Sequence, residues 1–594
     1  MTETTINPID AILSHHAGDD EQLNFITTPN KKVIVQAPAG YGKTRTMVSK
    51  LAYILTTHQI LSPKKILTLT FSVNAAYKIK KDVIEQLPNI LQGNPSNTAI
   101  SLNSKISVSN YHGFCRKVLS RYGYLLHEQL RKVNEFTSFD DGRADNITKL
   151  DLGTAPDVVI ACTSYCDQIK ASGVQYLRDH FDAYNNHILT NFIPNEYISF
   201  NAILTLTLKL FHEHPSILKF YQKLYPIIFV DEFQDTNFFG YTLLKKFISN
   251  KTSVYLMGDA LQRIYGFIGA IPNILQNAQE KYDMEMIELK NNYRFRDNPN
   301  MLLLDNNIRR NAENMIAPSI TDDAAINLNI SDDQNAEAGY VFAKSQEIIA
   351  LNESDKVAIL FRNGFNNKNT HRVIDEFDSN GVEYFYGLFS DEDENYKRFH
   401  FNCAKEFSTL LKQSRLSKRT CKRHIDKVKA IYQEENNPLY SALIQLMEIF
   451  YERLYSEYSF ILLDDEDKVI LIKETFDGFG LKQYMEYVDS RIIISTIHGA
   501  KGLEWEYIIM PDMEQYSLPS WFGFCGDCPH KGNCELHPAS ANPKYIEEMS
   551  VFYVGFTRAK KEVFFSASNE GIRWNGDAQN RNLSCFLQLR GITF

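Results

Sequence analysis

Residues 38–44 have the types and spacing of a phosphate-binding loop, because they read Pro-Ala-Gly-Tyr-Gly-Lys-Thr. The glycines allow backbone N–H groups to close around phosphate oxygens, Lys43 can reach the β- and γ-phosphates, and the Thr44 hydroxyl can ligate Mg²⁺. Such a loop lies between a buried strand, predicted by the apolar run 33–37, and a helix, predicted through Leu55. The predicted nucleotide-binding residues of this segment are Ala37, Pro38, Ala39, Gly40, Tyr41, Gly42, Lys43, Thr44 and Arg45.

A second apolar run, residues 227–230, ends in two adjacent carboxylates, Asp231 and Glu232. Buried like charges raise each other's pKa unless a cation lies nearby, so a Mg²⁺ held by Asp231 and Thr44 accounts for the pair. Glu232 would then orient and deprotonate the attacking water. The alternative is an acidic turn in solvent without a catalytic role, and the phosphate-binding loop upstream favours the catalytic interpretation.

Three cysteines and a histidine lie close together near the carboxyl terminus. The predicted ligands are Cys525, Cys528, Cys534 and His537. This spacing suits a tetrahedral structural Zn²⁺ site that pins the loop 521–540. An iron–sulfur cluster completed by a cysteine from elsewhere is the less favoured alternative, and His530 is an alternative ligand.

The composition is that of a multidomain chain without export or membrane signals. The 594 residues, of which 44% are hydrophobic, are too many for one core and predict three to five units of domain size. No run approaches the roughly 18 apolar residues of a membrane span, and nine cysteines without a secretion signal favour a cytoplasmic setting. The net charge of −9 excludes a uniformly basic surface but leaves room for a local groove that binds DNA.

Residues 231–236 read Asp-Glu-Phe-Gln-Asp-Thr, and this segment resembles the second motif of UvrD/Rep-like superfamily 1 DNA helicases letter for letter. Five further segments resemble that family's motifs in the family's order: 67–76, 258–270, 292–294, 496–505 and 553–559. The resemblance implies an α/β fold with two RecA-like P-loop domains, each with a parallel sheet and a mainly helical insertion.

The resemblance also implies roles around the nucleotide for residues outside the loop. Gln22 would read adenine and Tyr293 would stack on it, while Glu504 would contact the ribose. An arginine finger is typically worth about 10³–10⁵ in rate, and Arg558 is the candidate. The predicted catalytic residues are Lys43, Asp231, Glu232, Gln262, Arg294 and Arg558.

Contacts with single-stranded DNA are implied by the same resemblance. Bases would stack on aromatic side chains, and stacking is worth about 1–3 kcal/mol per base. The predicted DNA-binding residues are Phe71, His112, Tyr265, Phe267, Thr496 and His498. Asn74 and Ile268 stand where the family usually has lysine and arginine, and Phe267 replaces a more usual tryptophan. Core packing is the alternative role for these aromatic residues.

The motifs divide the chain into two discontinuous domains. Strands of the second domain are predicted at 357–361, 491–495, 507–510 and 563–566. The predicted divisions are 1–114 and 196–281 for the first domain, 115–195 for its helical insertion, 282–379 and 486–594 for the second domain, and 380–485 for its accessory insertion. A basic stretch, 412–429, predicts an amphipathic helix that is either a solvated face or a contact with duplex phosphates.

We therefore expect an ATP-dependent DNA helicase or translocase that moves 3′→5′ on single-stranded DNA in repair, recombination or defence against foreign DNA. Its expected cofactors are ATP, Mg²⁺ and structural Zn²⁺, and its expected partners are single-stranded and forked DNA. An ATP-gated DNA-binding switch is one alternative. Another is a helicase-like subunit that recruits a nuclease, because residues 559–594 are too few for a nuclease domain.

The cysteine cluster gives a prediction that elemental analysis can check. Purified protein should contain about one equivalent of zinc, because three thiolates and one imidazole complete a tetrahedral shell. The double variant Cys525→Ser/Cys528→Ser should lose that zinc, whereas Cys403→Ser, outside the cluster, should retain it. Protein that contains neither zinc nor iron near one equivalent would contradict the metal site.

Overall fold

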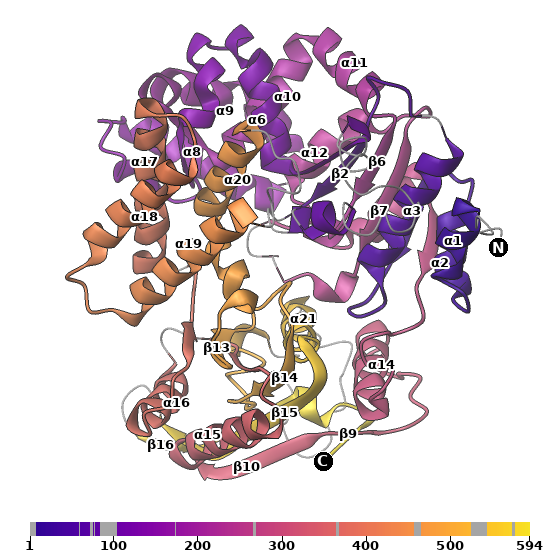
Figure 1. The fold of residues 1–594 in the computed structure, drawn as a ribbon, viewed down its shortest axis with the longest axis vertical. Coiled ribbons are helices and arrows are strands. Elements are labelled where there is room, and N and C mark those ends of the chain that lie inside the picture. The colour runs from indigo at the N-terminus through magenta and orange to yellow at the C-terminus, as the bar shows by residue number, and fades with distance from the viewer. Residues whose placement is uncertain are drawn as a thin grey trace, which may run out of the picture.

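The computed structural model has two parallel β-sheets, each flanked by helices, and two mainly helical insertions (Figure 1). It describes residues 7–58, 60–71, 75–76, 78–83, 104–172, 174–264, 266, 269–363, 367–391, 393–456, 465–523, 543–572 and 577–594. The predicted α/β class with two RecA-like domains is confirmed. Within the described ranges, no helix is both long enough and apolar enough to cross a membrane.

The first sheet has the strand order β3-β2-β6-β7-β1-β8, and every neighbouring pair is parallel. Its strands are β1 (Lys32–Gln36), β2 (Ile66–Thr70), β3 (Ile106–Asn110), β6 (Ile227–Val230), β7 (Ser253–Gly258) and β8 (Glu285–Glu288). Side chains alternate between two cores: Val33 and Val35 pack with α3 (Lys43–Thr57), whereas Ile34 joins the core on the other face. Burial on both faces explains the continuous apolar runs that marked these strands in the sequence.

The second sheet has the order β10-β15-β14-β11-β13-β12, also parallel throughout, with a short antiparallel strand at its edge. Its strands are β10 (Asn327–Asp333), β11 (Val357–Phe361), β12 (Phe385–Gly387), β13 (Ile492–Thr496), β14 (Trp505–Met510), β15 (Ala559–Ile572) and the antiparallel β16 (Ala578–Asn580). Three of these, β11, β14 and β15, contain predicted strands, and β13 overlaps the fourth, 491–495, from Ile492.

Helices cover both sheets. Around the first sheet, besides α3, lie α1 (Pro8–Ser14), α2 (Asp20–Thr27), α11 (Pro215–Leu224), α12 (Phe238–Phe247) and α13 (Ile274–Tyr282). The second domain has α14 (Pro299–Glu313), α15 (Gln334–Leu351), α16 (Lys368–Ser379) and α21 (Pro543–Phe556). Asp19 caps α2, since its side chain accepts the Gln22 N–H at 2.9 Å.

Each insertion is mainly helical, and the two lie side by side (Figure 1). The first contains α6 (Tyr111–Tyr122), β4 (Thr137–Phe139), α8 (Pro156–Ser172), α9 (Val174–Asn191), β5 (Tyr197–Ser199) and α10 (Phe200–Glu213). The second contains α17 (Glu394–Gln413), α18 (Lys418–Tyr432), α19 (Pro438–Ser456) and α20 (Asp465–Asp477).

Strand pairing corrects three of the predicted boundaries. The second domain was expected to begin at residue 282, but β8 pairs with β1 in the first sheet. The first insertion was expected to end at residue 195, but β5 pairs with β4 inside it. The accessory insertion was expected from residue 380, but β12 pairs with β13 in the second sheet. These strands have only three or four residues, so the sheet decides their position and not their own sequence.

A buried ionic cluster attaches the accessory insertion to the first domain. Arg116 on α6 is fully buried, and its Nε lies 2.8 Å from Glu474 Oε1 while Nη2 lies 2.9 Å from Asp477 Oδ2, both on α20. Asn110 at the end of β3 donates to Glu474 Oε2 at 3.0 Å. Buried charges are tolerated only when they are paired, so the two insertions dock in one defined arrangement.

This docking predicts a large loss of stability for Arg116→Met. The change leaves Glu474 and Asp477 buried without the cation that pairs with both of them, and breaking a buried pair in this way costs about 3–5 kcal/mol. Urea unfolding followed by fluorescence measures the loss. Arg131→Met is the control, since its pair with Glu128 is 53% and 74% exposed and should change stability by less than about 1 kcal/mol. Equal, small effects of the two changes would contradict the buried-pair account.

Candidate active site

The predicted phosphate-binding loop connects β1 to α3 at the carboxyl edge of the first sheet. Gly40 and Gly42 have φ of 84° and 77°, which glycine adopts without strain. A Cβ would also clash at both positions, lying 2.6 Å from Arg294 Cβ at Gly40 and 2.8 Å from Gln22 Nε2 at Gly42. The loop therefore leaves the first N–H groups of α3 facing the cleft, where an anion is favoured.

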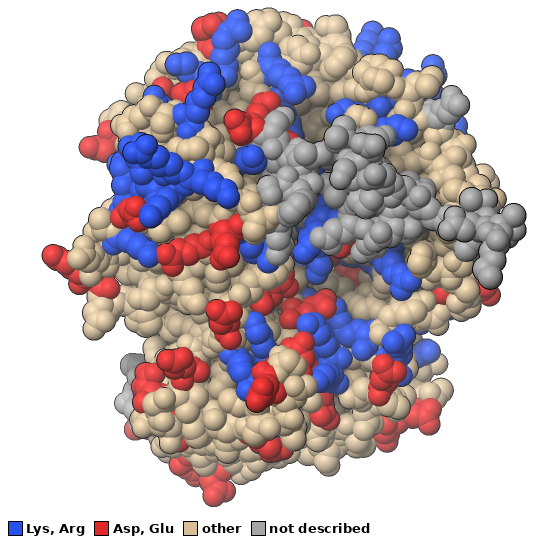
Figure 2. Space-filling view, in the orientation of Figure 1, with Lys and Arg blue, Asp and Glu red and all other residues tan. Residues whose placement is uncertain are grey.

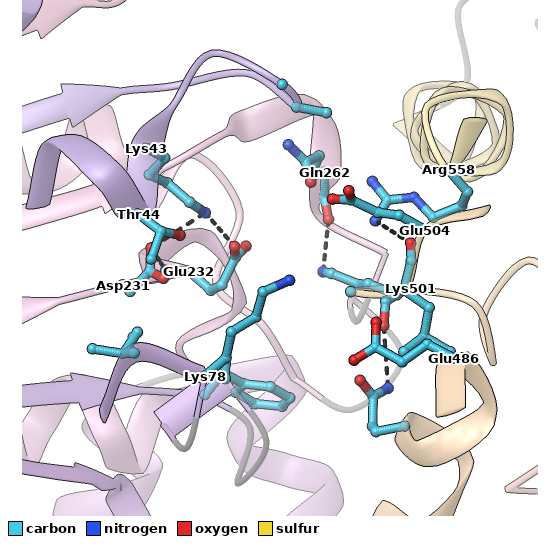
Figure 3. A pocket seen from close by; sticks show the side chains of 18 of the residues that line it. Lys43, Thr44, Lys78, Asp231, Glu232, Gln262, Glu486, Lys501, Glu504 and Arg558 are labelled. Carbon is cyan, nitrogen blue, oxygen red and sulfur yellow. Dashed lines mark hydrogen bonds and ion pairs between the residues drawn. The ribbon is translucent and has the colours of Figure 1, made fainter. Parts of the chain in front are cut away.

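Lys43 and the two carboxylates that follow β6 form one buried charge cluster (Figure 3). Lys43 Nζ lies 3.2 Å from Asp231 Oδ1 and also pairs with Glu232. The φ of 51° at Glu232 turns the chain so that both carboxylates face the lysine. The cluster lies where a phosphate-binding loop would hold Mg²⁺ and phosphate.

Burial and charge pairing shift the pKa values of these groups in opposite directions. Burial raises the pKa of Asp231. Burial also raises the pKa of Glu232, but Lys43 and Lys501 lower it more, to about 2. Burial would lower the pKa of Lys43, yet the two carboxylates raise it above its usual value. Lys43 and Glu232 are therefore both charged at neutral pH.

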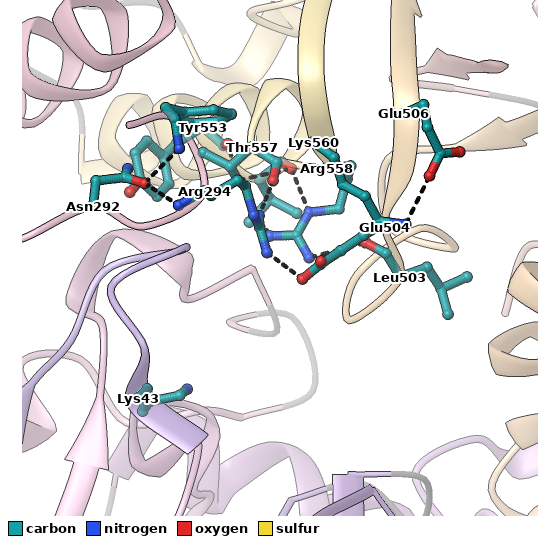
Figure 4. Close-up of polar contacts among 12 residues, drawn as sticks. Lys43, Asn292, Arg294, Leu503, Glu504, Glu506, Tyr553, Thr557, Arg558 and Lys560 are labelled. Carbon is teal, nitrogen blue, oxygen red and sulfur yellow. Dashed lines mark hydrogen bonds and ion pairs between the residues drawn. The ribbon is translucent and has the colours of Figure 1, made fainter. Parts of the chain in front are cut away.

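Two arginines face this cluster from the amino edge of the second sheet. Arg294 pairs with Glu504, which precedes β14, and also donates to the Thr557 carbonyl (Figure 4). Arg558, which precedes β15, donates from Nε to the Val554 carbonyl at 2.9 Å. Burial, with repulsion from Arg294 next, lowers the pKa of Arg558 to about 10. Both guanidiniums are thus held within the second domain, apart from Lys43 in Figure 4.

Most of the predicted ATP-site residues line one cavity of about 410 Å³ between the two domains. Residues of both domains contribute to it, so the cleft is a shared site. The predicted residues that line it are Pro38, Ala39, Gly40, Gly42, Lys43, Thr44, Arg45, Phe71, Asp231, Glu232, Gln262, Arg294, Glu504 and Arg558.

Gln22 and Tyr293, the residues predicted to contact adenine, lie beside the loop. Gln22 is buried, with its side-chain oxygen against His16 Nδ1 and its Nε2 donating to the Tyr41 carbonyl at 3.1 Å. Tyr293 is 39% exposed, and its hydroxyl donates to Asp19 Oδ2 at 2.6 Å. A Cβ on Gly42 would contact both side chains, so the two lie together at one end of the loop.

The remaining loop residues have structural contacts. Ala37 is buried and its N–H donates to the Gly258 carbonyl at 2.9 Å, extending the pairing of β1 with β7. The Tyr41 hydroxyl donates to Asp305 Oδ2 at 3.0 Å. Arg45 is exposed and donates to the His15 carbonyl at 3.1 Å.

Of the predicted DNA-binding residues that the structure describes, only Phe71 lines the cavity. Phe71 follows β2 and lines the cavity. His112 packs edge-to-face on Phe200, with ring centroids 6.1 Å apart, and burial lowers its pKa. The Thr496 hydroxyl accepts the Gly499 N–H at 3.0 Å, and burial lowers the pKa of His498 to about 3. None of these last three lines the cavity as described, and Tyr265, Phe267, Asn74 and Ile268 lie outside the described residues.

Sequence reasoning missed Lys501, which is one of the residues that bridge the cleft. Its Nζ lies 2.7 Å from Asp235 Oδ2 and donates to the Gln262 carbonyl at 2.8 Å (Figure 3). Burial raises the pKa of Asp235 to about 6 although Lys501 opposes the change. Lys78 was also missed, and its side chain points into the cavity (Figure 3). Lys501 lies in the segment 496–505, which resembles a family motif. A single lysine in a glycine-containing turn does not indicate which residue it pairs with.

The predicted zinc ligands Cys525, Cys528, Cys534 and His537, with the alternative His530, lie outside the described residues. In the part of the chain that the structure does describe, no group of three or more His, Cys, Asp or Glu side chains is arranged to hold a metal ion. The zinc site therefore stays a prediction from the sequence.

Comparisons with known proteins point to one family. A model of the UvrD/REP helicase N-terminal domain matches residues 19–283, and a model of the UvrD-like helicase C-terminal domain matches residues 394–570. The chain is similar to a probable DNA helicase II homolog of Rickettsia conorii, 24% identical over 93% of this chain and 92% of the relative. A probable DNA helicase II homolog of Mycoplasma genitalium is 22% identical over 97% of this chain and 89% of the relative.

The ATP-dependent DNA helicase PcrA of Staphylococcus aureus is 28% identical over 302 residues. That alignment covers 48% of this chain, and the chain spans only 39% of the length of this relative.

The charge cluster predicts that Glu232→Gln reduces turnover by about 10²–10⁴, because a positioned proton acceptor is removed while the shape is kept. Nucleotide affinity should persist, since Lys43 and the loop are unchanged. Steady-state release of phosphate and equilibrium binding of a fluorescent ADP measure the two quantities. Glu506→Gln is the control, because Glu506 pairs with Lys560 at 3.0 Å outside the cavity. Turnover by Glu232→Gln equal to that of the control would exclude Glu232 as the base.

Proposed function

The chain belongs to the UvrD/REP family of ATP-dependent DNA helicases, and we propose that it hydrolyses ATP in the cleft to move 3′→5′ along single-stranded DNA. One observation carries the proposal: Lys43 on the first domain and Arg294 and Arg558 on the second face a single cavity. In a site divided in this way, the lysine and the arginines can contact the same phosphates only when the domains approach each other. Hydrolysis and domain movement are therefore linked.

The residues around the cavity fit ATP with Mg²⁺. The glycine-containing loop at the start of α3 offers backbone donors for phosphate. The carboxylates that now pair with Lys43 would pair equally well with a divalent cation. Thr44 and Asp231 would hold the ion, which when bound neutralises charge on the phosphates. Tyr293 and Gln22 would receive the adenine, and Glu504 the ribose.

Glu232 is the proton acceptor in this proposal. Its Oε2 accepts a hydrogen bond from Gln234 Nε2 at 2.6 Å, which orients the carboxylate. When Lys43 turns towards phosphate, Glu232 loses its strongest partner and its pKa rises from about 2, which makes it a better base. Gln262 Nε2 donates to Asp259 Oδ2 at 2.8 Å, a contact that holds this amide at the rim of the cavity.

The arginines must exchange partners before they can act. Arg294 would leave Glu504, and Arg558 would leave the carbonyls of its own domain, to donate to phosphate oxygens. For Arg558, such charge-assisted hydrogen bonds are stronger than the carbonyl contacts that they replace, whereas Arg294 exchanges one anionic partner for another. The exchange ties hydrolysis to closure of the cleft.

Phe71 supports coupling to DNA. It follows β2 and lines the same cavity as the phosphate-binding loop, so an aromatic position for base stacking and the ATP site share one wall. Tyr265 and Phe267 are predicted from the sequence to stack on bases and lie outside the described residues.

A basic surface on the accessory insertion supports forked DNA as the substrate. The predicted amphipathic helix is α18, which buries Cys421, His424 and Val428. Lys427 and Lys429 pair with acidic residues of α17 and α19. The exposed remainder forms the basic area at the left of Figure 2: Arg415, Lys418, Arg419, Lys422 and Arg423. We propose that these side chains contact phosphates of the duplex ahead of the single strand.

A second candidate is an ATP-gated switch that binds DNA without unwinding it. The buried pairs of Arg116 with Glu474 and Asp477 favour it, because they tie the accessory insertion to the first domain and restrict its movement. A role in repair, recombination or defence, alone or with a nuclease partner, is compatible with either activity.

The test is ATP hydrolysis with single-stranded DNA, duplex DNA and RNA, combined with strand separation of duplexes carrying either overhang. The proposal predicts stimulation by single-stranded DNA and unwinding only with a 3′ overhang. Stimulation without strand separation supports the switch, and activity only with a co-purified protein supports a subunit role. No hydrolysis under any condition would exclude both enzymatic proposals.

A further inference from the structure

Helix α14 carries two largely buried charges, Asp305 and Arg309, that lie outside the predicted site. They lie one turn apart, so both project from one face of the helix. Asp305 is fully buried, and the Arg309 side chain is 12% exposed. Neither is among the residues that line the cavity, yet their partners come from both domains.

Asp305 joins the phosphate-binding loop to the second domain. Its carboxylate accepts three hydrogen bonds: from the Tyr41 hydroxyl at 3.0 Å, the Tyr553 hydroxyl at 2.8 Å and Asn292 Nδ2 at 3.1 Å. Burial raises the pKa of Asp305, while Arg309 and the three donors oppose this effect. A buried carboxylate that loses one of these donors has no water to replace it, so the three partners are held at fixed positions.

Arg309 makes a parallel connection to the segment 258–270, which resembles a family motif. Its Nη1 lies 3.1 Å from both oxygens of Asp259 and 3.2 Å from the Tyr553 hydroxyl. Asp259 is the same carboxylate that accepts the hydrogen bond from Gln262. The Asp259 carboxylate, which holds Gln262, and the Tyr553 hydroxyl therefore both contact the guanidinium of Arg309.

Asn292 and Tyr553 lead from this network to the two arginines of the site (Figure 4). Asn292 Oδ1 accepts the backbone N–H groups of Arg294 at 2.9 Å and of Phe295 at 3.0 Å, which fixes the turn that carries Arg294. Tyr553 lies on α21, one turn before Thr557 and Arg558, and its carbonyl accepts the Thr557 N–H at 3.1 Å.

We propose that Asp305 and Arg309 are positioning residues, which set Arg294 and Arg558 relative to the phosphate-binding loop and Gln262. The inference rests on the proposed ATPase function. A shift of the loop or of Gln262 changes the contacts of Tyr41 or Asp259, and the buried network passes this change to the turn of Arg294 and to α21. The network is therefore a physical connection between the two halves of the site.

Arg309→Gln tests the proposal, with Arg310→Gln as the matched control because Arg310 is the next residue and exposed. Arg309→Gln should lower kcat of DNA-stimulated hydrolysis by about 10- to 100-fold, the loss expected when catalytic groups are misplaced. KM for ATP and the affinity for a fluorescent ADP should stay within about threefold, because the arginines act on the transition state. Arg309→Lys should recover part of kcat, since it keeps the charge opposite Asp259.

A second variant covers the case in which Arg309→Gln does not fold, as judged by thermal unfolding. Tyr553→Phe removes only the hydroxyl that contacts Asp305 and Arg309, and it should lower kcat with unchanged nucleotide affinity. A kcat equal to that of the wild type in the folded variants, or a rise in KM at unchanged kcat, overturns the proposal. Wild-type protein without any ATPase activity would instead reject the proposed function, before the variants are compared.

Discussion

Pairing of buried charges within each half of the cleft is the constraint on which the rest of the site depends. Lys43 is satisfied by Asp231 and Glu232 on one side, and Arg294 by Glu504 on the other. A buried charge without a partner is costly, so each half must hold its own counter-charges until a ligand replaces them. A triphosphate with Mg²⁺ offers both kinds of charge at once, and it can satisfy the two halves only when they face each other closely.

Among the described residues, several polar contacts join the two domains beside the cleft. Lys501 meets Asp235 and the Gln262 carbonyl, Arg309 meets Asp259, and Tyr41 meets Asp305. Each of these contacts involves a residue that lines the nucleotide cavity, or a neighbour that holds such a residue in place. Charged and hydrogen-bonded contacts can exchange partners without unpacking a hydrophobic core. One core on each sheet is packed within its own domain, and a third core joins Ala39, Leu261 and Ile264 of the first domain to the second. On the proposed function, the polar contacts are the ones that nucleotide binding would change.

Local signals in the sequence were sufficient for the first half of the site. The loop at 38–44 and the carboxylates after 227–230 are set by glycine spacing and by strand-to-turn transitions within a few residues. Non-local features were beyond sequence reasoning: β8 has charged residues at both ends, and only its pairing with β1 places it in the first sheet. Likewise, the hydrogen bond of Tyr41 to Asp305 joins residues far apart in the chain, so no periodicity could reveal it.

A crystal structure with a transition-state analogue of ATP and single-stranded DNA tests the central claim most directly. The account predicts that Arg294 has left Glu504, that Arg558 has left the Val554 carbonyl, and that both guanidiniums lie about 3 Å from oxygens of the γ-phosphate analogue. An analogue held by Lys43 and the phosphate-binding loop, with both arginines still on their present partners, would contradict it.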